Sequence, residues 1–404
     1  MLEQVDRPIP CDFGMVNHHL LEAIATAIAR PFLPESTLDN GDIGYSIENS
    51  EVVSLSLRGC GVHEVPEAIF QLDTLQQLDL TSNYFRTLPA SIGNLRQLRA
   101  LYLDDNQLTA LPASITRLAQ LQSMHLDLNA LIELPENMGD LQNLTHLYLR
   151  RNRLKHLPDS LRRWSNLQVA SLGENPLGSL PESIGDLQNF RQLYIHNNDL
   201  TSLPQRIGDL KHLSTLDIGH NALTSLPESL GNLSSLTDFL YISDNQLTAL
   251  PYSLANLVNL TYLGITHNQF TSLPDWIGDL SGLRELRIYN NQLTTLPESI
   301  GQLTHLRELH ANANYITHLP DTIGSLSNLQ LLDLRNNHLR RLPDSLAKLS
   351  QLEQLDLRSN QLTSLPDSLS QLPNLRKLDL RWNKIRHELD WLKALHERGC
   401  TIYR

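Results

Sequence analysis

A single repeat with a period of 23 residues runs through most of this 404-residue chain. Apolar residues mark the start of each unit, and every step is 23 residues except one of 24, from Leu236 to Leu260; the marks are Val52, Leu75, Leu98, Leu121, Leu144, Leu167, Phe190, Leu213, Leu236, Leu260, Leu283, Leu306, Leu329, Leu352 and Leu375. A fixed period of this length indicates stacked supersecondary units, each burying its apolar side against its neighbours. Residues 52–389 therefore form one array of about fifteen units.

Each unit follows the pattern LxxLxLxxNxLxxLPxxIGxLxx, whose positions are numbered here as columns 1 to 23. Alternation in the LxL segment predicts a short strand with its leucines inward and the side chains of columns 3, 5, 7, 8 and 10 outward. Asparagine fills column 9 in fourteen units, from Asn83 to Asn383, with Cys60 in the first. Its amide suits backbone groups left unpaired where the chain turns.

Proline follows the apolar residue of column 14 in fourteen units, from Pro66 to Pro366. It holds the chain extended as it leaves the strand side. The segment after it is too short for a long helix, so we expect one helical or 3-10 turn per unit on the opposite side.

This pattern resembles the leucine-rich repeat family over about residues 52–389, and its LPxxIGxL form is similar to the intracellular Ras-group repeats of plants, an animal Ras scaffold and bacterial relatives. The resemblance implies an α/β solenoid, a curved horseshoe with a parallel concave β-sheet and short helical or 3-10 turns on its convex side. It also implies a protein-interaction scaffold or adaptor in intracellular signalling.

Both ends of the array need caps, because an open stack exposes its apolar faces. Residues 1–51 are expected to form an N-terminal cap, with an amphipathic helix over Asn17–Arg30 and an irregular connection over Pro31–Ser50. The repeat pattern ends at Glu388 and Leu389. Residues 390–404 are expected to close the array with a helix over Asp390–Arg398 and a short strand over Cys400–Tyr403.

Composition narrows the classes of partner. A net charge of −12 argues against nucleic acid, whose affinity rests on clustered Lys and Arg. The sequence has no apolar run long enough to span a membrane and no secretory signal pattern, so we expect a cytoplasmic protein. Cys11, Cys60 and Cys400 predict neither a disulfide framework nor a zinc site. The sequence does not give the oligomeric state, and a monomer is the working expectation.

The variable outward columns are where a binding site is expected, since the conserved columns build the frame. Eight of the eleven tyrosines fall there, and tyrosine offers rigid amphipathic contact area. Stacking between neighbouring strands would also explain them. The predicted protein-binding or peptide-binding residues are Tyr102, His125, Tyr148, Arg150, Tyr194, His196, Tyr241, Tyr262, Tyr289 and His310.

Two irregular features fit less simply. Asp333, Asp356 and Asp379 in column 5 face Arg335, Arg358 and Arg381 in column 7, which predicts exposed ion pairs of little energetic weight, or an arginine row that grips an acidic segment. The residue inserted in the ninth unit is expected to form a bulge that displaces Tyr241, or to be neutral.

Catalytic patterns are missing: the sequence has no phosphate-binding loop, HExxH, paired CxxC or GxSxG. We therefore expect no enzymatic activity, cofactor or metal. Two other functions stay open: a bacterial effector that recognises a host protein, and a metal-dependent enzyme in which His196, Asp217 and His220 approach one another.

Overall fold

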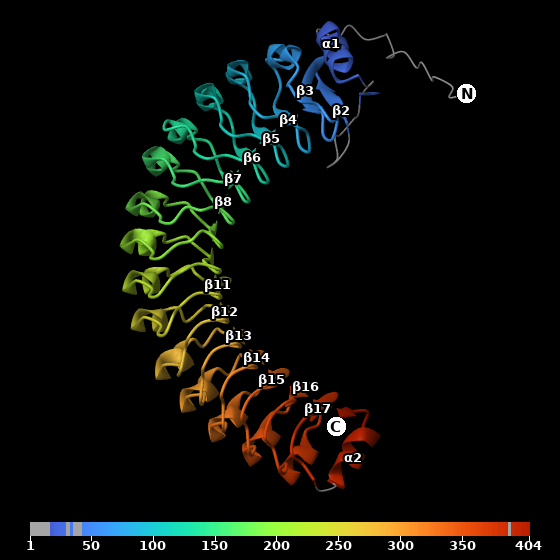
Figure 1. Cartoon of the computed structure of the whole chain (residues 1–404), viewed down its shortest axis with the longest axis vertical. Coiled ribbons are helices and arrows are strands. Elements are labelled where there is room, and N and C mark those ends of the chain that lie inside the picture. Colours follow the sequence, from blue (N-terminus) through green and yellow to red (C-terminus); the bar gives the residue numbers. More distant parts are fainter. Residues whose placement is uncertain (1–16, 30–32, 35–42, 387–388) are drawn as a thin grey trace, which may run out of the picture. The chain divides into compact units, whose positions relative to one another are not determined.

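The structure is a computed structural model that describes residues 17–29, 33–34, 43–386 and 389–404. The chain divides into two compact units, Met1–Phe190 and Arg191–Arg404, called unit 1 and unit 2 below. Both have the same architecture. Strands line one side of the ribbon and 3-10 turns line the other (Figure 1).

Unit 1 begins with helix α1 (His18–Ile28) and strand β1 (Leu33–Pro34). Its other strands are β2 (Gly44–Glu48), β3 (Glu51–Ser56), β4 (Gln77–Asp79), β5 (Ala100–Tyr102), β6 (Ser123–His125), β7 (His146–Tyr148) and β8 (Val169–Ser171). Its 3-10 turns are η1 (Glu67–Gln71), η2 (Ala90–Asn94), η3 (Ala113–Arg117), η4 (Met138–Asp140), η5 (Asp159–Arg163) and η6 (Glu182–Asp186). From β3 to β8 each strand pairs in parallel with the next, and residues of the same column lie opposite one another.

Unit 2 continues the pattern. Its strands are β9 (Gln192–Tyr194), β10 (Thr215–Asp217), β11 (Phe239–Tyr241), β12 (Tyr262–Gly264), β13 (Glu285–Arg287), β14 (Glu308–His310), β15 (Leu331–Asp333), β16 (Gln354–Asp356), β17 (Lys377–Asp379) and β18 (Thr401–Tyr403). Its turns are η7 (Gln205–Asp209), η8 (Glu228–Asn232), η9 (Tyr252–Asn256), η10 (Asp275–Asp279), η11 (Glu298–Gln302), η12 (Asp321–Ser325), η13 (Asp344–Lys348) and η14 (Asp367–Gln371), followed by helix α2 (Trp391–Glu397). The parallel strands, the 3-10 turns and the stacked repeats confirm the predicted solenoid fold.

Of the two outcomes expected for the inserted residue, the displacement of Tyr241 does not occur. Tyr241 lies opposite Asp217 on β10 and Gly264 on β12, so it keeps its place in column 5. The chain takes up the extra residue at Asp238, just before β11, where the Asp238 amide donates to the carbonyl of Ser214. The strand itself therefore contains no bulge.

The asparagines of column 9 tie each repeat to the one before it. The Asn106 amide nitrogen donates to the carbonyls of Leu103, 3.1 Å away, and of Leu80, 3.0 Å away in the preceding repeat. Its oxygen accepts the amide of Phe85 at 3.1 Å. The same three bonds recur at Asn129, Asn152, Asn175, Asn268, Asn291 and Asn314. Buried backbone groups are thus satisfied at the turn.

The glycine of column 19 lets neighbouring turns approach closely. A Cβ atom at Gly93 would lie 2.6 Å from the carbonyl oxygen of Ser114 in the next repeat. A Cβ atom at Gly208 or Gly231 would lie still closer to the carbonyl oxygen of Ser229 or Ser253 respectively. Only a residue without a side chain permits this spacing without a shift.

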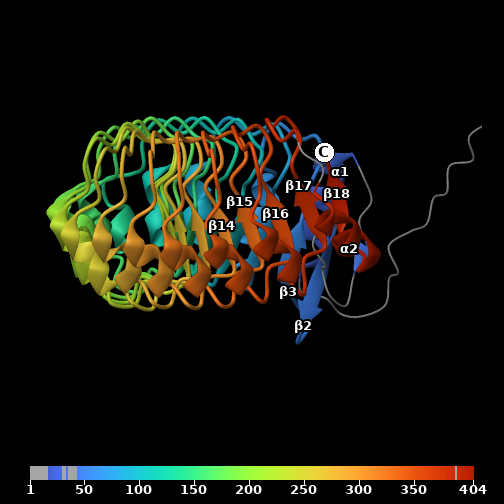
Figure 2. The ribbon, with the colours of Figure 1, turned by 90° about the horizontal axis from the view of Figure 1, so that it is seen from below.

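The N-terminal end partly differs from the expectation. Helix α1 lies within the predicted range, buries Leu20, Leu21, Ile24 and Ile28, and packs against η1. The prediction of an irregular connection over Pro31–Ser50 is wrong for Gly44–Glu48, which forms strand β2. This strand runs antiparallel to β3, and both are labelled in Figure 2. Strand β2 pairs the free backbone groups of β3, an edge that would otherwise be exposed. Residues 35–42 lie outside the described part.

At the C-terminal end, the predicted helix and strand are present as α2 and β18. Strand β18 pairs in parallel with β17, and α2 packs against η14 and β18. Glu388 lies outside the described residues. Among the helices that the structure describes, none has the length and hydropathy needed to cross a bilayer.

Candidate binding face

The outward side chains of columns 3, 5, 7, 8 and 10 form what we call the strand face of each unit. Column 4 and 6 leucines such as Leu101 and Leu103 are fully buried beneath it, whereas Tyr102 between them is partly exposed. All ten residues predicted as binding residues lie on this face. Tyr262 is the most buried, at 9% exposure, and Arg150 is exposed.

Three aromatic side chains stack in unit 1, and we call them the Tyr102 cluster: Tyr102, His125 and Tyr148. Ring centroids are 4.6 Å apart between Tyr102 and His125, and 4.3 Å apart between His125 and Tyr148. The cluster arises because column 5 residues of β5, β6 and β7 lie directly opposite one another. It presents a continuous aromatic ridge on the strand face.

Carboxylates of column 7 border the Tyr102 cluster. Asp104 accepts the backbone amide of Asp127 at 2.7 Å, and Asp127 accepts that of Arg150 at 2.7 Å. Burial raises the pKa of Asp104 to about 6, although the bond from the Asp127 amide acts in the other direction. Burial also lowers the pKa of His125 to about 4. His125 Nδ1 lies 3.7 Å from Asp104, but burial opposes both charged forms, so the two do not form a salt bridge at neutral pH.

Positive charge lies next to this acidic border. Arg150 donates from Nε to Glu174 at 2.7 Å, and Arg151 lies 3.2 Å from the other oxygen of Glu174. One carboxylate therefore holds the two guanidinium groups of the segment that follows β7. The Tyr102 cluster is therefore bordered in column 7 by both signs of charge, with Asp104 and Asp127 followed by Arg150.

A second aromatic group lies in unit 2. The rings of Tyr241 and Tyr262 stack with centroids 6.4 Å apart, and Phe239 tilts against Tyr262 at 5.2 Å. The guanidinium of Arg287 sits 5.6 Å from the centre of the Tyr262 ring, and burial raises the pKa of Tyr262 to about 12. Phe239 is 51% exposed, so much of its ring faces solvent beside Tyr262.

Histidines and acids alternate along unit 2. His196 Nδ1 lies 3.1 Å from Asp217, whereas His220 lies 3.5 Å from Asp244, which is also 3.7 Å from His267. The ring of His267 meets Tyr289 edge-on at 5.3 Å. The metal site considered from the sequence, with His196, Asp217 and His220 as ligands, does not form. His220 pairs with Asp244 of the next repeat instead.

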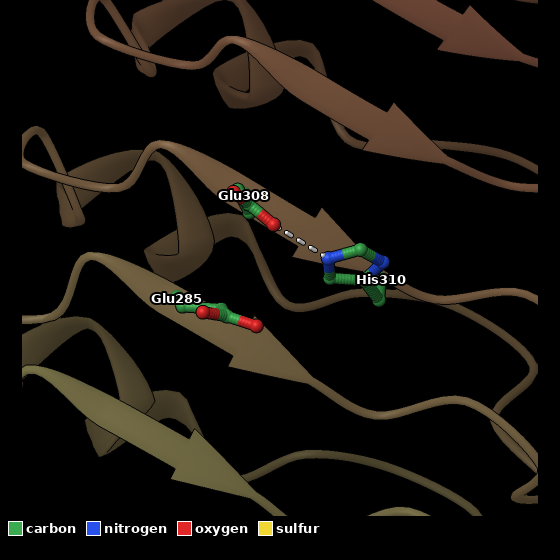
Figure 3. A group of neighbouring side chains, drawn as sticks. All are labelled: Glu285, Glu308 and His310. Atoms are coloured by element: carbon green, nitrogen blue, oxygen red, sulfur yellow. Dashed lines mark hydrogen bonds and ion pairs between the residues drawn. The ribbon is translucent and has the colours of Figure 1, made fainter. Parts of the chain in front are cut away.

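Another mixed group does come together. Glu285, Glu308 and His310 place one ligand atom each within 4.8 Å of one another, the single such group among the described residues. His310 Nε2 is 2.9 Å from Glu308, and Glu285 lies on the neighbouring strand (Figure 3). Glu285 also accepts Arg287 Nε at 2.5 Å.

The aspartate and arginine rows near the C-terminus were predicted as exposed pairs, and this is wrong for Asp333 and Asp379. Asp379 is fully buried and Asp333 is 8% exposed. Burial alone would raise the pKa of Asp379, but hydrogen bonds from Arg381 and the charge of Arg358 outweigh it and lower that pKa. The pairs of Arg335 with Asp333 and of Arg381 with Asp379 belong to the frame of unit 2, because in each a guanidinium covers a buried carboxylate.

Sequence reasoning passed over several residues on this face. These residues all stand in outward columns: Phe239, Asp244, Glu285, Arg287 and Glu308. Phe239 and Arg287 contact the predicted Tyr262, and Glu308 contacts the predicted His310. Their column positions were the available signal, because residues of the same column in neighbouring repeats lie side by side. The prediction selected mainly tyrosines and histidines from these columns and therefore left these five residues out.

The chain belongs to the leucine-rich repeat family. It matches the family described as leucine-rich repeat region over residues 52–130, 174–261, 245–315 and 300–399, and the leucine rich repeat family over residues 142–200. Members of this family are typically binding modules rather than enzymes. No curated protein sequence matches the chain significantly.

Solved structures agree with this family. A leucine-rich repeat protein of Leptospira interrogans is 33% identical, with a TM-score of 0.81, over 91% of this chain and 99% of that one. A plant peptide hormone receptor, RGFR1, solved in complex with RGF2, is 30% identical, with a TM-score of 0.63, over 80% of this chain and 57% of that one. A TDR receptor is 28% identical, with a TM-score of 0.73, over 88% and 63%.

Proposed function

We propose that this protein is a scaffold or adaptor that binds a protein or peptide through its strand face, with the Tyr102 cluster as a central contact. The stacked rings of Tyr102, His125 and Tyr148 carry the proposal, because they are partly exposed, rigid, and bordered by both signs of charge. The similar plant receptor was solved in complex with RGF2, which supports a peptide or protein as the class of partner.

The location and the kind of pathway are part of the same proposal. Because the LPxxIGxL repeat is similar to the intracellular Ras-group repeats, we propose that the protein works in the cytoplasm as a monomer in signal transduction. Fractionation of its native cells with an antibody against the chain tests the location, and light scattering of the purified protein tests the monomer.

The binding proposal is tested by quantitative affinity capture. The double variant Tyr102→Ala and Tyr148→Ala should lose proteins that the wild type retains, because alanine removes most of the aromatic contact area. Tyr252→Ala is the matched control, since Tyr252 is 73% exposed on turn η9, away from the strand face. If the double variant retains the same proteins as the wild type and the control, the Tyr102 cluster is not the contact.

A further inference from the structure

The group of Glu285, Glu308 and His310 combines two carboxylates with an imidazole on the strand face of unit 2. Glu308 and His310 stand two residues apart on β14, so both side chains project from the same side of the sheet. Glu285 on β13 lies directly opposite Glu308 in the strand register. Figure 3 shows the three side chains on two neighbouring strands, with His310 and Glu308 in contact.

The sequence makes this group unlike the other charged positions of the array. In column 3, Glu285 and Glu308 are the only acidic residues of the fifteen repeats, and they are adjacent. Glu285 has an arginine two residues along its strand, as do Asp333, Asp356 and Asp379. Glu308 has His310 instead. The second acid of the pair is therefore matched with a group that binds metals rather than with a permanent cation.

We propose that Glu285, Glu308 and His310 bind a divalent transition-metal ion, with Zn²⁺ the best match to the ligand set. One imidazole nitrogen and two carboxylate oxygens are ligands that zinc accepts in sites with an open position. The three ligand atoms already lie within 4.8 Å of one another, so small rotations of the side chains would place each of them at roughly 2.0–2.2 Å from one shared ion, the bond length that zinc requires. Binding replaces the contact between His310 Nε2 and Glu308 with two bonds to the ion.

Arg287 fits this arrangement as an outer partner of the site. Its Nε donates to one oxygen of Glu285, which leaves the other oxygen of that carboxylate for the ion. Carboxylates that bind metals are commonly held by such hydrogen bonds, which fix their orientation. Arg287 is itself held over the ring of Tyr262. Its positive charge lowers the affinity for a cation, so we expect a moderate affinity rather than a permanently filled site.

The site leaves room for a ligand from outside the chain. Three protein ligands leave at least one position of the ion open. A cavity of about 230 Å³ lies beside His310, lined also by Leu331, Asp333, Arg335 and Arg358. The open position can therefore take water or a histidine, cysteine or carboxylate side chain of another molecule. This site does not depend on the proposed function of the Tyr102 cluster, which lies in unit 1.

Calorimetric titration of the chelator-treated full chain with ZnCl₂ tests the proposal. The wild type should bind one Zn²⁺ at this site, and His310→Ala and Glu308→Gln should each weaken that binding by at least about tenfold. Mg²⁺ in large excess should not displace it, because magnesium prefers an all-oxygen octahedral site. Circular dichroism of each variant verifies that the fold is retained.

His338→Ala is the matched control, because His338 is an exposed strand-face histidine of the next repeat outside the group. It should bind Zn²⁺ as the wild type does. The proposal is overturned if the wild type takes up no Zn²⁺, if His310→Ala and Glu308→Gln bind it undiminished, or if His338→Ala loses as much affinity as they do.

Discussion

Asp104 and His125 show how burial, rather than mutual attraction, sets the charge of single residues on the strand face. Burial raises the pKa of Asp104 to about 6, so the folded chain keeps a proton between about pH 4 and pH 6 that the unfolded chain releases. The contribution of Asp104 to the free energy of unfolding therefore falls as the pH rises through that range. Burial lowers the pKa of His125 to about 4, and its contribution rises with pH over nearly the same range. The two effects oppose each other.

Replacing Asp104 separates these two contributions. Asp104→Asn keeps an oxygen for the Asp127 amide but removes the poorly solvated charge, so it should stabilise the fold at pH 7.5 and have no such effect at pH 4. The free energy of unfolding should rise by on the order of 1–2 kcal/mol. This is less than the free energy equivalent of the whole pKa shift, because a quarter of the Asp104 side chain is exposed. Chemical denaturation at both pH values measures it. Asp105→Asn, at an exposed neighbour, is the control. A larger gain at pH 4 would contradict the assignment.

Residue pairs were harder to predict from the sequence than residue positions. Tyr102, His125 and Tyr148 could be placed side by side because a period of 23 residues puts column 5 of each repeat in register. The partner of His220 could not be predicted in the same way, because the His220 side chain reaches forward to Asp244 instead of back toward His196. The side-chain rotamer decides this choice, and the repeat pattern does not encode it.

At the scale of single elements, the spacing between 3-10 turns depends on glycine. Gly93→Ala should destabilise unit 1 by about 1–3 kcal/mol, because the new Cβ would lie 2.6 Å from the Ser114 carbonyl oxygen and the turns must separate. Urea denaturation followed by circular dichroism measures the loss.

The chain supplies a reverse control for this substitution. Ala347 occupies the same column in turn η13. Ala347→Gly removes a methyl group that the backbone already accommodates, so it should lower the free energy of unfolding by no more than about 1 kcal/mol. Equal stability of Gly93→Ala and the wild type would show that close turn spacing is not what keeps glycine in this column.

Elements that follow the repeat were predictable from its columns. Helices α1 and α2 and strand β18, which lie outside the repeat, were predicted as well, but strand β2 was not. Strands β3 to β17 and their turns follow from alternating leucines and the proline of column 15. Strand β2 has no column pattern, and only the need to cover the edge of β3 accounts for it. A disturbed strand was one of two outcomes expected for the inserted Asp238. The segment before β11 takes up the extra residue instead, with the Asp238 amide bonded to the Ser214 carbonyl.

At the scale of the whole molecule, the reactivity of the two described thiols measures the folding of each unit separately, because one thiol is buried in each. Cys60 in unit 1 is 8% exposed and Cys400 in unit 2 is 1% exposed, and burial raises the pKa of Cys400. The reactive species is the thiolate, so neither thiol should react with a disulfide reagent in the native protein, and both should react in denaturant.

Cys11 lies outside the described residues, so the measurement uses a Cys11→Ser background, with Cys60→Ser and Cys400→Ser added one at a time. Absorbance of the released thiol of the reagent at pH 8 then follows each remaining cysteine alone. Rapid reaction of either thiol without denaturant would show that its unit does not bury it as the structure describes.

Each repeat carries a complete set of attachments to its neighbour, and this has a consequence for how such a chain can change over generations. The amide of Asn106 needs only its own backbone and that of the preceding repeat. A duplicated stretch of 23 residues therefore brings with it the asparagine hydrogen bonds to the preceding repeat, and a deleted stretch removes only its own. The array can therefore be lengthened or shortened by whole repeats, and its outward side chains reordered, with the same contacts between neighbouring repeats.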